Sequence, residues 1–181
     1  MSSAAFAAPQ RWLAQGDIFE RLLFVRAGVA DSTATSALDH SPALLISHGC
    51  AIDKKSSGGR SRLEYLSFLP LQSVTALPRE RQENLRRSDG QLRPYEAMYL
   101  GDVPSVGESY VLLTQPYTLP ASLLRTELRE FTAEETGEEA GSRVVATMWE
   151  TRVACLSDNA LDLFTRKWIA QWTRMLVESD A

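Results

Sequence analysis

Short apolar runs, each bounded by turn-forming residues, succeed one another along most of this chain. Residues 43–47 form one such run between Pro42 and Gly49, and its continuous apolar character is typical of a strand buried on both faces. Residues 63–74 alternate poorly between polar and apolar side chains, so we expect both faces of this strand to be covered, with Pro70 at an edge or a bulge. The pattern predicts a mainly β protein. Further strands are expected at 18–29, as one long strand or a strand pair, and at 97–100, 109–114 and 143–147.

The segments between these runs are polar or rich in turn formers, which predicts connectors. We expect a loose N-terminal tail at residues 1–14, a polar connector at 30–42 and an exposed loop at 56–61. Residues 115–142 are predicted to form a loop-and-short-helix insertion, because their second half is rich in glutamate and favours contact with solvent.

Two helices are expected. Residues 78–87 predict a short exposed helix with a proline in its first turn. Residues 158–177 predict a long amphipathic helix with Ser157 or Asp158 as its N-cap. Its apolar face holds Leu161, Phe164, Trp168, Trp172 and Met175, and its polar face holds Asp162, Arg166, Lys167, Gln171 and Arg174. The two tryptophans are expected in the core or in a dimer interface.

The composition favours one ordinary domain spanning residues 1–181. A chain with 44% hydrophobic and 23% charged residues can build a packed core. Its net charge of −4 and pI of about 5.3 argue against a broad nucleic-acid-binding face, although one local basic patch is compatible with them. No apolar run approaches the ~20 residues that cross a bilayer, and the start of the chain lacks the basic region of a signal peptide. Two cysteines are too few for a disulfide framework. We therefore expect a cytoplasmic protein with reduced thiols and no membrane association.

Three short motifs then occur in an informative order: GDI at residues 16–18, PALLIS at 42–47 and PLQS at 70–73. This order resembles the MazF/PemK-like toxin family, in which a GDI strand, a strand that begins with Arg-Pro and a PlTS strand build the active groove of a small SH3-like β-barrel. The resemblance implies an α+β fold with such a barrel at residues 15–156. The long C-terminal helix at 157–177 would close the barrel.

Ser47, Cys50, Ile52, Asp53 and residues 108–111 and 156–158 match a second pattern, "GDIF…lISh.CdID" followed by a later strand and a terminal helix. Through them the chain also resembles a looser group of uncharacterised bacterial proteins. Two positions depart from the toxin pattern. Ser41 stands where the toxins have the arginine that stabilises transition-state charge, and Gln72 stands where they have a threonine. Ser73 matches the final serine of that motif. The resemblance therefore implies the fold more directly than it implies the toxin activity.

A metal-independent ribonuclease needs a base for the 2′-OH proton, cations for the phosphate charge and an acid for the leaving oxygen. His48 is the candidate base or acid, and Arg60 and Arg62 are the candidate cations. Ser73 would add a hydrogen bond from the neighbouring strand. These four residues form the candidate catalytic set.

Candidate substrate-binding residues are Lys54, Lys55 and Asp17. Residues 54–62 contain four cations and no carboxylate, so this basic loop could attract RNA although the whole chain is acidic. The alternative for the loop is a solvated segment without a ligand. The alternative for Asp17 is a turn anchor that accepts backbone N–H bonds.

Two other chemistries use the same segment. A metal site would combine His48, Cys50 and Asp53 with Asp17 or His40. Zinc sites usually take three or four protein ligands, and this chain has two cysteines and two histidines in all, so we expect no metal and no cofactor. A nucleophilic Cys50 activated by His48 is the other alternative, against a buried and inert Cys50.

Two functions from different classes remain. The first is a binding or interaction module that keeps the toxin fold without its catalytic residues, in a bacterial toxin–antitoxin or phage-defence context. The second is an endoribonuclease that uses His48, Arg60, Arg62 and Ser73. We expect a homodimer, with a partner protein or RNA as further binding partners.

Overall fold

The computed structural model describes residues 6–9, 13–30, 33–48, 52, 64–121, 124, 129–130, 144–145 and 152–178. Within these ranges the strands are β1 (Phe6–Ala7), β2 (Asp17–Ala30), β3 (Thr33–Leu45), β4 (Tyr65–Ser73), β5 (Ala97–Val103), β6 (Gly107–Leu112), β7 (Tyr117–Pro120), β8 (Arg129–Glu130), β9 (Val144–Val145) and β10 (Arg152–Leu156). The helices are the 3-10 helix η1 (Val74–Ala76), α2 (Arg79–Arg87) and α4 (Asp158–Glu178).

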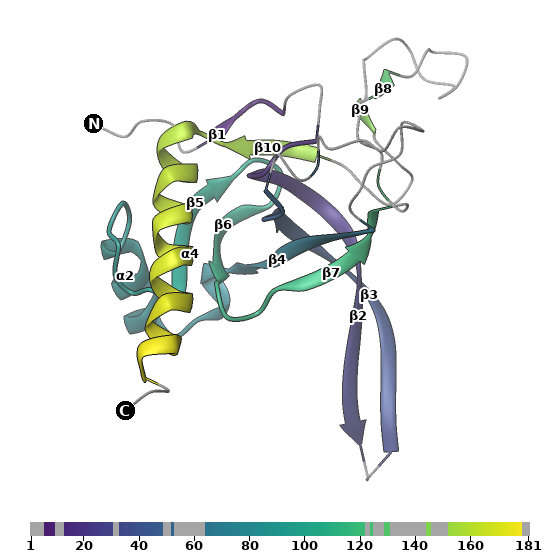
Figure 1. The fold of residues 1–181 in the computed structure, drawn as a ribbon, viewed down its shortest axis with the longest axis horizontal. Coiled ribbons are helices and arrows are strands. Elements are labelled where there is room, and N and C mark those ends of the chain that lie inside the picture. The colour runs from purple at the N-terminus through teal and green to yellow at the C-terminus, as the bar shows by residue number, and fades with distance from the viewer. Residues whose placement is uncertain are drawn as a thin grey trace.

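One antiparallel sheet of eight strands forms the body of the protein. Its order is β1–β10–β2–β3–β4–β6–β5, and β7 pairs with β4 outside this path. The sheet curls into a nearly closed barrel, and α4 lies beside it (Figure 1), where residues of β5, β10 and α4 line one small pocket. β8 and β9 form a separate two-stranded ladder.

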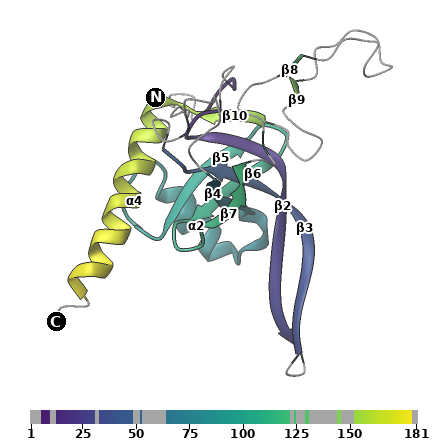
Figure 2. The ribbon, with the colours of Figure 1, turned by 45° about the vertical axis from the view of Figure 1, so that its right-hand side comes forward.

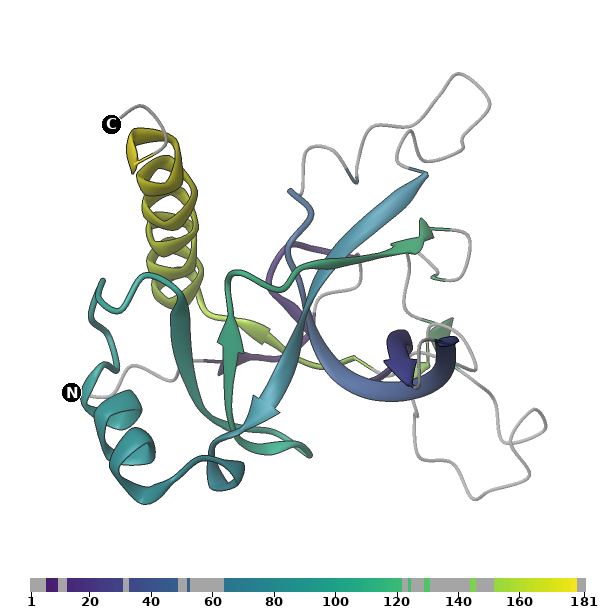
Figure 3. The same ribbon diagram turned by 90° about the horizontal axis from the view of Figure 1, so that it is seen from below.

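β4 links the two halves of the barrel because it pairs with three other strands. β3 pairs along one edge, while the other edge pairs with β7 at residues 65–68 and with β6 at residues 71–73. Pro70 lies between the β7 and β6 pairings and is paired with Ala43 on the other side, so the edge or bulge predicted for it stays a prediction. Figure 3 shows β4 as a long strand that crosses the molecule.

Successive residues of the central strands point into two apolar cores on opposite faces of the sheet. Leu44 lies in the core inside the barrel, whereas its neighbours Ala43 and Leu45 lie in the second core. β4 alternates in the same way: Leu66 and Phe68 belong to the second core, and Leu69 and Leu71 to the inner one. The two-sided burial predicted for these strands is confirmed.

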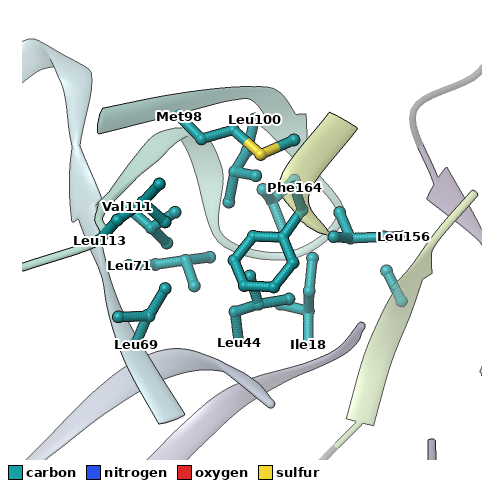
Figure 4. Packing of buried hydrophobic residues seen from close by; sticks show 12 residues of the cluster. Ile18, Leu44, Leu69, Leu71, Met98, Leu100, Val111, Leu113, Leu156 and Phe164 are labelled. Carbon is teal, nitrogen blue, oxygen red and sulfur yellow. The ribbon is translucent and has the colours of Figure 1, made fainter. Parts of the chain in front are cut away.

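α4 covers the barrel with the apolar face that its sequence predicts. Ser157 is the N-cap, since its Oγ accepts a hydrogen bond from the backbone N–H of Ala160 at 3.4 Å. Phe164 is only 2% exposed and reaches into the inner core (Figure 4). It packs among residues of β2, β3, β5 and β10, so one helical side chain fills the centre of the barrel.

The prediction of a polar connector at residues 30–42 is wrong. β3 begins at Thr33 and pairs with β2 from Leu22↔Ser41 to Ala30↔Thr33, which makes a long hairpin arm. The arm extends well beyond the barrel (Figure 2). Its many threonines and serines looked like a connector, but they also suit a strand once a partner strand is available.

Two other predicted segments also differ. The tail predicted at residues 1–14 contains β1, which pairs with β10, and Leu13 is 2% exposed. The insertion predicted at 115–142 contains β7, which extends the sheet from β4. The strand β10 was not expected as a separate element. It matters because it brings the end of the barrel sequence back to β2.

The structure confirms the mainly β class with helices, as a barrel-like sheet with α2 and α4. The finer SH3-like plan of the MazF/PemK family stays a prediction. Across the described ranges, neither helix has the combination of length and apolar character that would let it cross a bilayer.

Candidate functional site

The strand register separates the two candidate catalytic residues that the structure describes. Ser47, next to His48, accepts a hydrogen bond on its Oγ from the backbone N–H of Ser67 at 2.8 Å, near the beginning of β4. Ser73 is the last residue of the same strand. Because each residue of a strand advances by about 3.3 Å, the part of β4 from Ser67 to Ser73 is roughly 20 Å long, measured along the strand. This length of strand separates His48 from Ser73, whereas Arg60 and Arg62 of the predicted catalytic set lie outside the described residues, so the set as a whole stays a prediction.

The surroundings of these two residues differ as well. His48 is exposed shortly after the end of β3 at Leu45, and residues 49–53 separate it from the basic loop. Ser73 is exposed at the other end of β4, and its hydroxyl forms a hydrogen bond with that of Thr75 at 2.8 Å. Arg60, Arg62, Lys54 and Lys55 lie outside the described residues, as do Cys50 and Asp53.

Gln72, which stands at the threonine position of the toxin motif, joins a polar network on the sheet. Its Oε1 accepts a hydrogen bond from the hydroxyl of Tyr110 at 2.6 Å, and its Nε2 donates one to Gln115 at 3.3 Å. The side-chain amide of Gln72 thus connects β4 to Tyr110 on β6 and to Gln115 in the turn between β6 and β7. This is a structural use of the side chain.

The GDI motif forms a junction of three strands. Gly16 has a φ of +95°, which favours glycine, and a Cβ there would lie 3.4 Å from Cβ of Leu156. Its N–H donates to the carbonyl of Leu45 at 2.9 Å, and its own carbonyl accepts from the N–H of Leu156 at 2.9 Å. The motif thereby connects the end of β3 to the end of β10.

Asp17 is wholly buried at this junction, so it is not placed to bind a substrate as predicted. Its Oδ2 accepts a hydrogen bond from the backbone N–H of Ala14 at 2.9 Å, which confirms the alternative prediction of a turn anchor. The same oxygen lies 2.8 Å from Nη1 of Arg152, and both side chains are fully shielded from solvent. Arg152 was not predicted as a partner of Asp17, because 135 residues separate the two in the sequence.

Burial controls the electrostatics of this pair. Burial raises the pKa of Asp17 above its ordinary value, and the hydrogen bonds from Ala14 and Arg152 offset this only in part. Burial and the neighbouring Asp17 also raise the pKa of Cys155 to about 12, so this thiol stays protonated and is a poor nucleophile. We conclude that the junction is a structural polar centre of the barrel.

An ion pair attaches α2 to the barrel. Arg86 makes two hydrogen bonds of 2.6 Å to the carboxylate of Glu108 on β6, and the hydroxyl of Tyr99 on β5 donates to the same carboxylate at 2.7 Å. These bonds, first from Arg86 and then from Tyr99, lower the pKa of Glu108 to about 2. The bidentate geometry fixes the orientation of α2 against the sheet.

Beside this ion pair, the end of α2 and the segment leading to β5 enclose a surface hollow of about 810 Å³. Its charged lining residues are Arg87, Arg93 and Glu96. Its other lining residues are Asn84, Ser88, Gln91, Pro94 and Tyr95. The helix α2 was predicted from the sequence, but no site was expected here, because the hollow forms only when residues 91–96 fold back beside the helix.

Lys167 lies behind the wall of this hollow, which corrects its predicted place on the polar face of α4. It is 1% exposed, and its Nζ donates to the carbonyls of Pro94 at 2.6 Å and Ala97 at 3.0 Å. Burial lowers its pKa to about 8, so the ammonium is still charged at neutral pH. The lysine thereby fastens α4 to the segment that lines the hollow.

The described residues contain no cluster of three or more histidine, cysteine, aspartate or glutamate side chains that could hold a metal ion. The predicted metal alternative depends on Cys50 and Asp53, which fall outside those residues. In comparisons with known proteins, no protein-family model matches the chain, and no curated protein is significantly similar to it.

Proposed function

We propose that this protein is a binding module on a MazF/PemK-like barrel, in a bacterial toxin–antitoxin or phage-defence context, and that it does not cleave RNA. The observation that supports this is the position of His48 and Ser73 near opposite ends of β4. A base and a hydrogen-bond donor that act on one phosphate must both lie within about 3 Å of the reacting atoms. Asp17 is buried against Arg152 and contributes nothing to such a site.

We expect purified protein to leave structured and unstructured RNA intact in EDTA, and also after zinc or manganese is added back. Gel analysis of labelled RNA measures this, with His48→Ala as the matched control. Cleavage by the wild-type protein that His48→Ala abolishes would contradict the proposal. It would instead support the alternative of a ribonuclease built on exposed His48 and the basic loop at residues 54–62, without Ser73.

The proposed module acts as a homodimer, and the hairpin arm is the surface that supports this. In the described part of the chain, the outer edge of β3 meets another strand only from Ala43 onwards, so residues 33–38 present an edge to which a further strand can be added. Residues 33–38 carry no charge, so two copies of this edge can pair about a two-fold axis without like charges meeting, although the whole chain is acidic. A two-stranded ribbon is marginally stable alone, and pairing with a second arm would make it four-stranded.

Shortening the arm is expected to convert a dimer into a monomer. Val25 pairs with Leu38, so replacing residues 26–37 by Asn-Gly keeps the register and makes a tight hairpin. Size-exclusion chromatography with light scattering measures the mass. Trp172→Ala, which alters the exposed aromatic face of α4, is expected to leave the mass unchanged. If the variant with the shortened arm still has the mass of a dimer, or if Trp172→Ala has the mass of a monomer, the interface lies elsewhere.

A further inference from the structure

The geometry points to a binding site for a small phosphate-bearing ligand in the hollow formed by the end of α2 and the segment leading to β5, and we propose a free nucleotide as its class of ligand. This inference rests on the proposed function in one respect, that the protein binds a ligand without cleaving RNA. The site is distinct from the catalytic set that the sequence predicted. Neither His48 nor Ser73 lines the hollow.

The hollow has the size and polarity of a ligand site for a polar molecule. Its volume of about 810 Å³ falls in the range of ~300–1,000 Å³ that is usual for small-molecule sites. Its lining is dominated by side chains that donate hydrogen bonds, among them two guanidinium groups and the amides of Asn84 and Gln91. Such donors suit an anion with several acceptor oxygens, which describes a phosphate group.

The charges around the hollow favour an anion although the chain is acidic. Residues 79–93 carry five arginines and three carboxylates, against a net charge of −4 for the whole protein. Arg86 is neutralised by Glu108, and Glu83 lies near both Arg79 and Arg87, at 3.3 and 3.7 Å. The 3.7 Å contact of Arg87 is a loose one in a largely exposed side chain, which leaves its guanidinium able to turn towards a ligand.

A third cation, the buried Lys167, adds to the positive electrostatic potential at the wall of the hollow. The ammonium of Lys167 donates to the carbonyl of Pro94, a residue of the hollow's wall. It is buried in a region of low dielectric, where a charge acts over a longer distance than it does in water. Against Arg87, Arg93 and Lys167, the lining contributes one carboxylate, that of Glu96, which is exposed to solvent.

Arg93 and Tyr95 provide a place for a planar group beside the phosphate. The guanidinium carbon of Arg93 lies 5.7 Å from the centre of the Tyr95 ring, and Nε donates to the tyrosine hydroxyl at 3.3 Å. Arginine planes and tyrosine rings both stack on nucleobases. A nucleotide has both chemical parts that this lining matches, a phosphate for the guanidinium groups and a base for the stacking surface.

The test is isothermal titration calorimetry, in which the full-length protein is titrated with AMP, with inorganic phosphate and with adenosine. We expect AMP to bind, phosphate to compete with it, and adenosine to bind at least tenfold more weakly, because it lacks the charged group. Arg87→Ala/Arg93→Ala is expected to weaken AMP binding by roughly tenfold or more. Both side chains are exposed, so this variant should fold normally, which circular dichroism checks.

Arg79→Ala is the matched control. Arg79 is on the same helix and contacts the same Glu83, but it does not line the hollow, so AMP affinity should stay within about twofold of the wild-type value. Arg87→Lys/Arg93→Lys keeps the charge and should retain part of the affinity. Absence of AMP binding, equal affinity for AMP and adenosine, or unchanged binding in Arg87→Ala/Arg93→Ala would each overturn the inference.

The two proposals fail independently. AMP contains no phosphodiester bond, so its titration is unaffected by any ribonuclease activity. Cleavage of RNA that depends on His48 would therefore overturn the proposed function without changing this test. Failure of the AMP titration alone would remove the nucleotide site and leave a binding module whose ligand contacts another surface.

Discussion

Arg152→Ala is expected to lower the free energy of unfolding by about 3–5 kcal/mol, because it leaves the buried carboxylate of Asp17 without its cation. A domain of this size is stabilised by only ~5–15 kcal/mol, so the loss is a large share of the total. The change also weakens the junction through which β2 pairs with β10. Urea unfolding at neutral pH measures the effect.

The same variant should acquire a characteristic pH dependence. Arg152 helps to lower the pKa of Asp17, so its removal raises a folded-state pKa that burial already holds above the ordinary value. A carboxyl whose pKa is raised on folding keeps a proton that the unfolded chain releases. Its contribution to stability is therefore present at low pH and is lost as pH rises. The loss of free energy of unfolding in Arg152→Ala, compared with wild type at the same pH, should therefore be larger at pH 7 than at pH 5.

Two control variants distinguish the effect of removing the charge of Arg152 from the effect of removing its packing contacts. Asp17→Asn/Arg152→Ala removes both charges, and it should recover part of the lost stability and lose the extra pH dependence. Arg79→Ala removes an exposed arginine that contacts Glu83, and its unfolding should match that of the wild type. If Arg152→Ala unfolds like Arg79→Ala, the ion pair has no stabilising role in the barrel.

Phe164→Ala is expected to lower the free energy of unfolding by about 3–5 kcal/mol as well, by leaving a cavity at the centre of the inner core. The ring lies among Ile18, Leu44, Met98 and Leu156, which come from four different strands (Figure 4). No other side chain of α4 is as deeply placed in the apolar core among the described residues. The loss should be accompanied by faster amide hydrogen exchange along α4, because the helix loses its main apolar contact.

Ile169→Ala is the matched control for this prediction. Ile169 is on the same helix but is 55% exposed, so its truncation should change stability by no more than about 0.5 kcal/mol. Phe164→Leu keeps most of the apolar volume, so its free energy of unfolding should lie between those of Phe164→Ala and Ile169→Ala. Equal stabilities of Phe164→Ala and Ile169→Ala would mean that α4 is attached to the barrel by contacts other than Phe164.

Features that depend on local sequence were predicted well. The helix expected at residues 158–177 corresponds to α4 at Asp158–Glu178, because helical periodicity and an N-cap are properties of neighbouring residues. The buried strand at residues 43–47 and the helix at 78–87 were also predicted from local patterns. Asp17 was identified as a possible turn anchor from its place in the turn alone.

Features that depend on distant partners were not predicted. Residues 33–42 form a strand because β2 lies beside them, and their composition alone is that of a connector. Lys167 was assigned to the polar face of α4, but it is buried, and its hydrogen bonds are accepted by the carbonyls of Pro94, before β5, and Ala97, the first residue of β5. The candidate catalytic set combined His48 and Ser73 because both flank apolar strands, and only the register of β4 shows how far apart they are.

The sequence by itself determined the mainly β class, the helix that closes the barrel and the two-sided burial of the central strands. These follow from the periodicity of apolar residues, which acts over a few neighbours. Only the tertiary structure decided the arm, the Asp17–Arg152 pair and the hollow lined by Arg87 and Arg93. Each of these brings together segments that are separate in the chain, and their contacts arise from strand pairing and burial rather than from local propensity.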